Sequence, residues 1–363
     1  MILENLFKKK INRFVYIFSV FIISYVLINI YKLKSYKNNE GADPGFRSAK
    51  SITNNNDLCI VSNKNIDCQK KILTELNKNN KSILFLGNSQ MGAINNFKSG
   101  DLSYISFLSK NLKSKKSTIS IKGLWLPNAN IKEFEMIHQT LDKCDINTKL
   151  IMIPVFLDDT RINDIRDELD NYPYLICQKE KSINSVNSPN LSNIEKLNNN
   201  IKKRFKVFED LDGLNEKFRI DIYKIRNYFF NIKPTTIRNI RKTSYEDNIN
   251  SLSNIIKVRG NKKLKTLVYI PPLLNSNNGG PIPYKKIDYI NFKKQISKIC
   301  KPQNCIYLNL ENEVPTNLWG LKMSTNFKTQ KEELDFMHFT GQGHKIFADK
   351  FSEIITKYAK DIL

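Results

Sequence analysis

Three residues in two distant segments of the chain have the side chains that could form a serine nucleophile with its base. Ser89 lies in the segment LGNSQ at 86–90, and an Asp-x-x-His motif near the C-terminus places Asp335 three residues before His338. A serine hydroxyl is a weak nucleophile until a base takes its proton, and the base needs a carboxylate to orient it. About 250 residues separate the two segments, so only a fold that brings them together could make one site.

Each segment also has a purely structural interpretation. Ser89 could cap a helix or line a phosphate-binding turn, and Asp335 and His338 could cap a turn and pack between phenylalanines. The residues after Ser89 predict the start of a helix, where unpaired backbone N–H groups favour negative charge on an acyl oxygen. With one motif after the first strand and the other in the last loop, the pair favours a Ser-His-Asp site.

The elements that must position these residues follow from short apolar runs, which are typical of buried parallel strands. These runs cover 81–86, 118–122, 149–156, 264–270 and 305–310. Helical patterns lie between them, for example at 131–143, and a final helix is expected from 341 to about 360. Strands that alternate with helices predict an α/β domain with a parallel sheet over 81–363, and catalytic groups at the carboxyl ends of its strands.

The N-terminus predicts a membrane anchor. Residues 14–31 hold eighteen residues without a charge, about 27 Å of helix, which is close to the hydrocarbon thickness of a bilayer. Lysines and an arginine within 1–13 keep that tail cytoplasmic, and no small-residue cleavage site follows, which favours an uncleaved anchor over a signal peptide. We therefore expect a single-pass inner-membrane protein with a stalk and lead-in over 32–80 and a periplasmic, extracytoplasmic domain.

A long connection separates the third and fourth predicted strands. Residues of about 158–262 include a Ser/Asn-rich stretch at 182–200 and an amphipathic pattern over 201–229. We interpret this segment as a helical insertion over the strand ends. It could pack on the main core, or it could form a substrate lid or a face for a membrane partner.

Composition narrows the function classes only in part. The net charge of +23 comes from 58 Lys and Arg against 35 Asp and Glu, which suits an acidic partner or reflects a biased base composition of the gene. No nucleic-acid-binding module is recognisable. The sequence contains no cluster of cysteines and histidines that would indicate a metal site.

The six cysteines fit an oxidising compartment. Local loops could join Cys59 to Cys68 and Cys300 to Cys305, and Cys144 and Cys177 could form a third pair or remain thiols.

With these motifs in this order, the sequence resembles the SGNH/GDSL hydrolase superfamily. In that family the serine follows the first strand, where Asn88 here replaces the usual Asp of Gly-Asp-Ser, and Asp-x-x-His precedes the last helix. The matching segments are 81–123 and 264–363. The resemblance implies a three-layer α/β fold and acyl chemistry by the three motif residues, without a cofactor or metal.

The resemblance also implies an oxyanion hole. Its donors would be the Ser89 backbone N–H, a second-block glycine that maps on Gly123, and an asparagine after the third strand. That strand here ends PVFLDD at 154–159 without an asparagine, and the loss of one such donor typically costs about 10²–10³ in rate. Asn128, Asn130 or Arg161 could replace it.

Two residues are candidates for substrate binding. Arg161, together with lysines around the opening, could attract an anionic glycan, and Trp125 could stack on a sugar ring or belong to the core. His344, six residues after His338, is expected to be structural.

Within the superfamily the sequence most resembles single-pass proteins of cell-surface acylation, of the alginate O-acetylation and teichoic-acid D-alanyl-transfer type. These work beside a multi-pass membrane acyltransferase. The resemblance implies transfer of an acetyl or similar group to a polysaccharide hydroxyl. The alternatives are a carbohydrate esterase of the same fold and a non-catalytic glycan-binding accessory protein.

Overall fold

A sheet of six parallel strands organises the chain, with the order β2-β5-β3-β6-β7-β8. A computed structural model describes residues 49–52, 55–79, 81–177, 224–232, 236–274, 283–301, 304–322 and 333–362. The sheet strands are β2 Leu58–Ile60, β3 Ser82–Gly87, β5 Ser120–Trp125, β6 Leu150–Pro154, β7 Lys265–Ile270 and β8 Cys305–Asn309. The prediction of an α/β domain with a parallel sheet is confirmed.

The apolar runs formed strands because both faces of the sheet are covered. All six residues of β3 and all five of β6 are buried, so these strands show continuous apolar runs rather than alternation. The run predicted at 118–122 forms a strand two residues later, which continues through Gly123 to Trp125. A Cβ at position 123 would lie 2.8 Å from Leu58 Cδ1, so glycine lets the neighbouring strand β2 approach closely.

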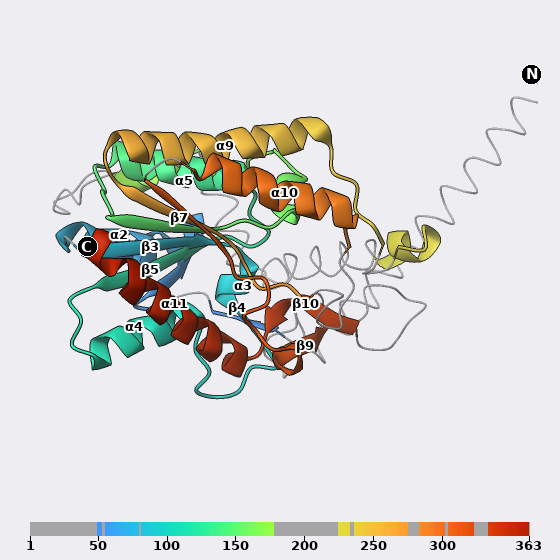
Figure 1. Ribbon diagram of the computed structural model, residues 1–363, viewed down its shortest axis with the longest axis horizontal. Coiled ribbons are helices and arrows are strands. Elements are labelled where there is room, and N and C mark those ends of the chain that lie inside the picture. The colour runs from blue at the N-terminus through green and yellow to red at the C-terminus, as the bar shows by residue number, and fades with distance from the viewer. Residues whose placement is uncertain are drawn as a thin grey trace, which may run out of the picture.

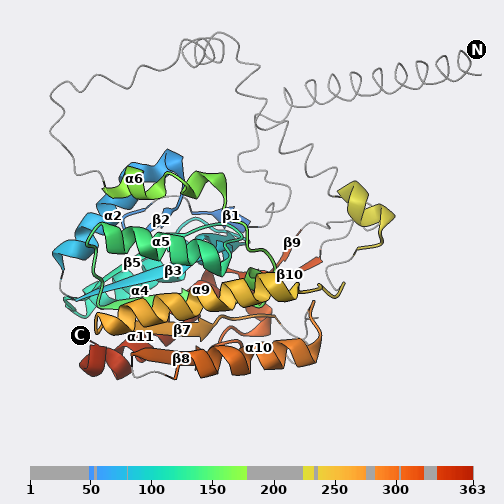
Figure 2. The same cartoon turned by 90° about the horizontal axis from the view of Figure 1, so that it is seen from above.

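Helices cover both faces of the sheet and make three layers (Figure 1). One face carries α2 Ile66–Lys78, α5 Ile131–Lys143, α9 Lys242–Asn261 and α10 Lys286–Ile299, and the other carries α4 Tyr104–Ser114 and α11 Gly341–Ile362. Figure 2 shows α5, α9 and α10 side by side on their face. The predicted helix at 131–143 is confirmed to the residue, and an Asn130–Glu133 capping box explains its start.

Two predicted boundaries are wrong. The lead-in assigned to 32–80 contains β2 and α2, which belong to the sheet and its covering layer because β2 pairs with β5. Strand β2 is only three residues long, too short for a periodic pattern. The helical insertion assigned to about 158–262 ends in α9, which is the crossover helix between β6 and β7 and packs on α5 and β7. The part of the insertion at 178–223 lies outside the described residues.

Small elements gather at the carboxyl ends of the central strands, where Figure 1 places α3, β4, β9 and β10 together. They are α3 Ser89–Gly92, β1 Ala49–Ser51 paired with β4 Ala93–Asn95, and β9 Trp319–Lys322 paired with β10 Glu333–Phe339. Helix α6 Tyr172–Cys177 lies elsewhere and packs on α2 and α5. A bridge joins Asn95 of β4 to Thr340 after β10. This bridge brings the first and last parts of the fold into contact.

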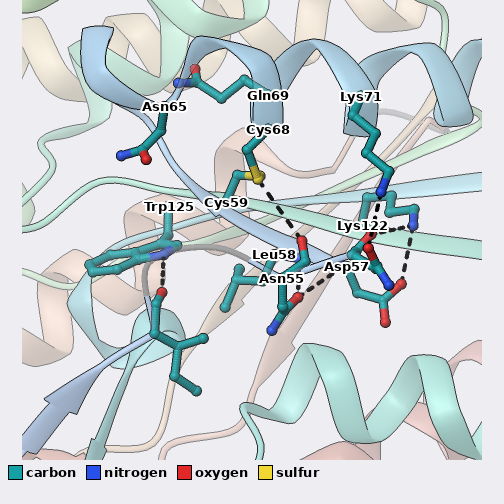
Figure 3. The surroundings of a disulfide bond; sticks show 12 residues. Asn55, Asp57, Leu58, Cys59, Asn65, Cys68, Gln69, Lys71, Lys122 and Trp125 are labelled. Atoms are coloured by element: carbon teal, nitrogen blue, oxygen red, sulfur yellow. Dashed lines mark hydrogen bonds and ion pairs between the residues drawn. A yellow bond between two sulfur atoms is a disulfide. The ribbon is translucent and has the colours of Figure 1, made fainter.

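Three disulfides join the cysteines as the sequence suggested: Cys59–Cys68, Cys144–Cys177 and Cys300–Cys305. The first joins β2 to α2, and Figure 3 shows it between the carbonyl of Asn55 and the side chain of Gln69. A disulfide typically contributes about 2–4 kcal/mol by constraining the unfolded chain.

The predicted anchor at 14–31 lies outside the described residues. Among the residues that the structure does describe, no helix has the length and apolar character needed to cross a bilayer.

Candidate active site

Ser89 is the first residue of α3, directly after β3 and the residue Asn88. The side chain of Asn88 accepts a hydrogen bond from the Gln90 N–H at 3.1 Å and so caps the short helix. At its other end α3 lies flat on an indole ring, because a Cβ on Gly92 would come within 2.1 Å of Trp125. The strand, the cap and the glycine contact therefore fix the position of the Ser89 hydroxyl.

Asp335 and His338 lie on β10, inside the stretch between Leu334 and Phe339 where its pairing with β9 is irregular. Asp335 Oδ1 accepts hydrogen bonds from the backbone N–H groups of Met337, at 3.0 Å, and His338, at 3.2 Å. These bonds make a tight local turn, so the Asp-x-x-His spacing places the carboxylate beside the imidazole of the same segment.

The structure brings the three predicted residues together. His338 Nε2 lies 3.0 Å from Ser89 Oγ, and His338 Nδ1 lies 2.8 Å from Asp335 Oδ2. The carboxylate accepts the Nδ1 proton, which leaves Nε2 as the acceptor for the serine proton. All three side chains are buried. This arrangement can activate a hydroxyl for attack on a carbonyl carbon.

The carboxylate of Asp335 stays ionised in this setting. Burial by itself raises its pKa, but the charge and hydrogen bond of His338, the charge of Lys322 and the Met337 N–H outweigh burial and lower the pKa to about 2. A permanent negative charge on Asp335 stabilises the imidazolium that forms when His338 takes a proton.

Two residues that support the triad carried no signal in the sequence. Asn95 Nδ2 donates to Asp335 Oδ2 at 3.1 Å and to the Leu321 carbonyl at 3.1 Å. Gln90 Nε2 donates to the carbonyls of Pro272 and Met337, both at 2.8 Å. These contacts join α3 and β4 to β10 and to the segment after β7, which are far apart in the chain, so spacing alone could not have identified them.

The prediction that Gly123 donates to the oxyanion is wrong. Its backbone N–H donates to the Asp57 carbonyl at 2.8 Å, because the residue lies in the middle of β5 between two neighbouring strands. Asn130 is also engaged, since it caps α5 and donates to the Asp164 carbonyl at 2.8 Å. Asn128 differs from both: it is an exposed residue in the turn after β5, with a positive φ of 51°.

The two residues predicted to bind substrate have different positions. Trp125 is buried and donates its indole N–H to the Ile52 carbonyl at 3.1 Å (Figure 3). It belongs to the core, so its assignment to substrate binding is wrong. Arg161 follows the short 3₁₀ turn Asp158–Thr160 after β6 and donates to Asp158 Oδ1 at 2.9 Å. Its role in substrate binding stays a prediction.

The loop after β6 carries a buried carboxyl, Asp159, in the segment where the sequence lacks the expected asparagine. Asp159 accepts a hydrogen bond from the Phe156 N–H at 3.1 Å and lies in hydrogen-bond contact with the side chain of Asn88. Burial, aided by the charge of Asp158, raises the pKa of Asp159 well above its ordinary value, although both hydrogen bonds act in the opposite direction. Asp159 thus supports the residue that precedes the nucleophile.

His344 is structural, as expected. Its Nδ1 accepts from the Tyr104 N–H at 3.1 Å and its Nε2 donates to the Ala93 carbonyl at 3.2 Å. In the part of the chain that the structure describes, no group of three or more histidine, cysteine or acidic side chains is arranged to hold a metal ion.

Comparisons with known proteins yield only distant likenesses. No protein-family model matches the sequence, and no curated protein matches it. Among solved structures, the acetylxylan esterase Axe2 from Geobacillus stearothermophilus has a TM-score of 0.41 and 10% identity, over 76% of this chain and 94% of its own. A protein described as a GDSL-like lipase, from Parabacteroides merdae, has a TM-score of 0.39 and 12% identity, over 76% and 95% of the two chains.

Proposed function

We propose that this chain is a serine enzyme of the SGNH/GDSL type that transfers an acyl group, most simply acetyl, to a hydroxyl of a cell-surface polysaccharide through an acyl-Ser89 intermediate. The observation that carries the proposal is the continuous hydrogen-bond chain from Ser89 Oγ through both ring nitrogens of His338 to Asp335. Its two links, at 3.0 and 2.8 Å, are in the range needed for proton transfer.

In the first half-reaction His338 Nε2 takes the proton of Ser89 Oγ as the oxygen attacks the acyl carbonyl. The Ser89 backbone N–H, at the first position of α3, and the turn at Asn128 after β5 are the donors that we assign to the resulting oxyanion. When the intermediate collapses, the bond to the leaving oxygen breaks and that oxygen takes the proton from His338. The acyl group then remains on Ser89.

In the second half-reaction the acceptor hydroxyl gives its proton to His338 Nε2 and attacks the acyl-serine. The ester bond to Ser89 breaks, and Ser89 Oγ recovers the proton. A sugar hydroxyl as acceptor gives transfer, and water as acceptor gives hydrolysis, because the same base serves both. A carbohydrate esterase is therefore the alternative outcome of the same site.

The location and partners belong to the same proposal. Three disulfides among the described residues suit an extracytoplasmic compartment, since cytosolic thiols are kept reduced. The uncharged stretch at 14–31 would anchor the domain to the inner membrane, beside a multi-pass acyltransferase that supplies the acyl group.

The test is to trap the acyl-enzyme. The full chain is incubated with p-nitrophenyl acetate, and mass spectrometry of the peptide that contains Ser89 should detect one added acetyl group. Ser89→Ala should remove the adduct and lower nitrophenol release by about 10³-fold or more. Ser114→Ala, which changes an exposed serine on α4, is the matched control and should behave as the wild type.

Adding oligosaccharides to the acetylated enzyme then separates the two outcomes. Acetylated sugar indicates transfer, whereas free acetate at an unchanged rate indicates an esterase. Equal nitrophenol release by wild type and Ser89→Ala, with no acetyl group on Ser89, would refute the proposal.

A further inference from the structure

A hollow lies between the first turns of two helices, α9 and α10. Its volume is about 400 Å³, within the range of small-ligand sites. Lys242 and Tyr245 of α9 line one side, Lys285 and Asp288 at the start of α10 line another, and Leu157 and Arg238 also contribute. Figures 1 and 2 show that α9 and α10 begin at the same end of the molecule as β10. We call this hollow the α9–α10 pocket.

Arg238 connects the α9–α10 pocket to the catalytic segments. Its guanidinium lies 5.5 Å from the ring centre of Phe336, the residue between Asp335 and Met337, and it forms an ion pair with Asp158. The next residue, Asp159, contacts the side chain of Asn88 beside the nucleophile. A ligand in the pocket would therefore contact a side chain, Arg238, that packs against β10, the strand that carries the triad acid and base.

The pocket has a positive lining. Lys242, Lys285 and Arg238 line it together with one carboxylate, Asp288, and Arg238 is already paired with Asp158, so the excess positive charge comes from the two lysines. Lys242 and Lys285 are exposed, and the ion pair of Lys242 with Glu246 is long, at 3.8 Å. Such exposed ion pairs contribute little to stability. Both ammonium groups can therefore bind a ligand with little loss of existing interactions.

The two helix starts add to this positive field. The N-cap positions of α9 and α10 are Arg241 and Lys285, and neither makes a side-chain cap hydrogen bond. The first-turn N–H groups of both helices therefore lack a capping acceptor from their own N-cap residue. Together with the cations, these positive helix ends favour an anionic group in the pocket.

The remaining lining suits a sugar. Asn239, Asn291 and Gln295 contribute side-chain amides, which can donate to and accept from hydroxyls. Tyr245 donates its hydroxyl proton to Gln295 Oε1 at 2.8 Å and so fixes the orientation of that amide. Orientation by a neighbour is what a binding site needs in order to hold a ligand in one pose.

We propose that the α9–α10 pocket binds an anionic group, a carboxylate or a phosphate, on the saccharide whose hydroxyl or ester reacts at Ser89. The proposal rests on the proposed function in naming the ligand as the substrate. It assigns the choice of substrate to residues outside the triad, so that an acidic sugar is held by the starts of α9 and α10 while an adjacent part of the same molecule reaches the serine.

Binding is measured in the full chain carrying Ser89→Ala, by calorimetry, so that the result does not depend on acyl transfer. The probes are trigalacturonate for the carboxylate, glucose 6-phosphate for the phosphate, and neutral xylotriose. We expect one of the two anionic probes to bind at least about tenfold more tightly than xylotriose, and added salt to weaken that binding. The anionic probe that binds identifies the group.

To test the pocket, Lys242→Glu and Lys285→Glu are introduced together into the Ser89→Ala protein. This pair of substitutions should weaken binding of the anionic probe by about tenfold or more. The matched control is Lys257→Glu with Lys294→Glu, which makes the same charge change at exposed positions of the same two helices outside the pocket. If the first pair is poorly folded by circular dichroism, Lys285→Ala alone replaces it. The inference is overturned if xylotriose binds as well as the anionic probes, if none of them binds, or if the two pairs weaken binding equally. Acetylation of Ser89 in the wild type reports on the proposed function separately.

Discussion

His338 and His344 are both buried and only six residues apart, yet their surroundings give them opposite properties. Asp335 accepts from Nδ1 of His338, whose Nε2 faces a serine hydroxyl. His344 has the opposite tautomer, with Nδ1 accepting from a backbone N–H and Nε2 donating to a backbone carbonyl. A histidine can act as a base where one nitrogen is held by an acceptor and the other is free to face the reacting group, and a carboxylate acceptor also stabilises the imidazolium. Burial alone does not distinguish the two.

The largest expected effects come from replacing each histidine. His338→Gln should lower nitrophenol release by about 10³-fold or more, because the base is lost. His344→Leu should instead lower the free energy of unfolding by about 2–4 kcal/mol, because the buried Tyr104 N–H and Ala93 carbonyl lose their partner. Rate per folded molecule and urea unfolding measure the two effects. A 10³-fold rate loss in folded His344→Leu would contradict the distinction.

A smaller effect tests how tightly the triad carboxylate must be held. Asn95→Ala removes a hydrogen bond to Asp335 Oδ2, and we expect about a tenfold lower rate because the carboxylate and its histidine are less well oriented. The pH–rate profile should change as well, which a loss of stability alone would not cause.

The matched control for that variant is Asn111→Ala. It removes another asparagine–aspartate bond, from Asn111 of α4 to Asp349 of α11 at 2.9 Å, which lies on the surface and outside the triad. Equal rate losses in the two variants would show that Asn95 has no special role in holding the acid.

A further difference concerns how the free energy of unfolding depends on pH. Burial lowers the pKa of His344 to about 3, although the Ala93 hydrogen bond raises it, and burial lowers that of His138 to about 4. The unfolded chain takes up these protons near pH 6.5, so the folded state should lose stability as the pH falls below that value, by at most about 1.4 kcal/mol per pH unit for each group.

Asp335 should act in a lower window. Its pKa falls from 3.8 to about 2 on folding, so its contribution to the free energy of unfolding is complete above about pH 4 and is lost as the pH falls toward 2.

Urea unfolding at several pH values between 7 and 3 tests the histidine prediction. The free energy of unfolding should fall less steeply with decreasing pH in His344→Leu than in the wild type. An unchanged slope would mean that His344 is protonated in the folded protein.

Much of the fold follows from local patterns. The fully apolar runs of β3 and β6 could be identified from sequence because strands covered on both faces need no alternation. Helix α5 could be placed because its capping residues Asn130 and Glu133 are adjacent in the chain. Strand β2, with three residues, has no such pattern, and its place at the edge depends on pairing with β5.

The site was predictable only where its residues stand in compact motifs. Ser89 follows a strand, and Asp335 and His338 are three residues apart, so both motifs could be read locally. Gly123 was misplaced because a glycine in mid-strand and a glycine in an oxyanion loop cannot be told apart without the register of β5. Asn95 acts through contacts across about 240 residues, which no spacing can disclose.

A disulfide links each edge strand of the sheet to a neighbouring helix. Strands β2 and β8 are its edges, and each contains one cysteine of a disulfide, Cys59 and Cys305, tied to the helix next to it in the chain. The interior strands β3, β5, β6 and β7 contain no such tie. Reduction of these disulfides would therefore destabilise the edge strands β2 and β8 first. The nucleophile follows the interior strand β3, so it would lie in the part of the sheet that unfolds last.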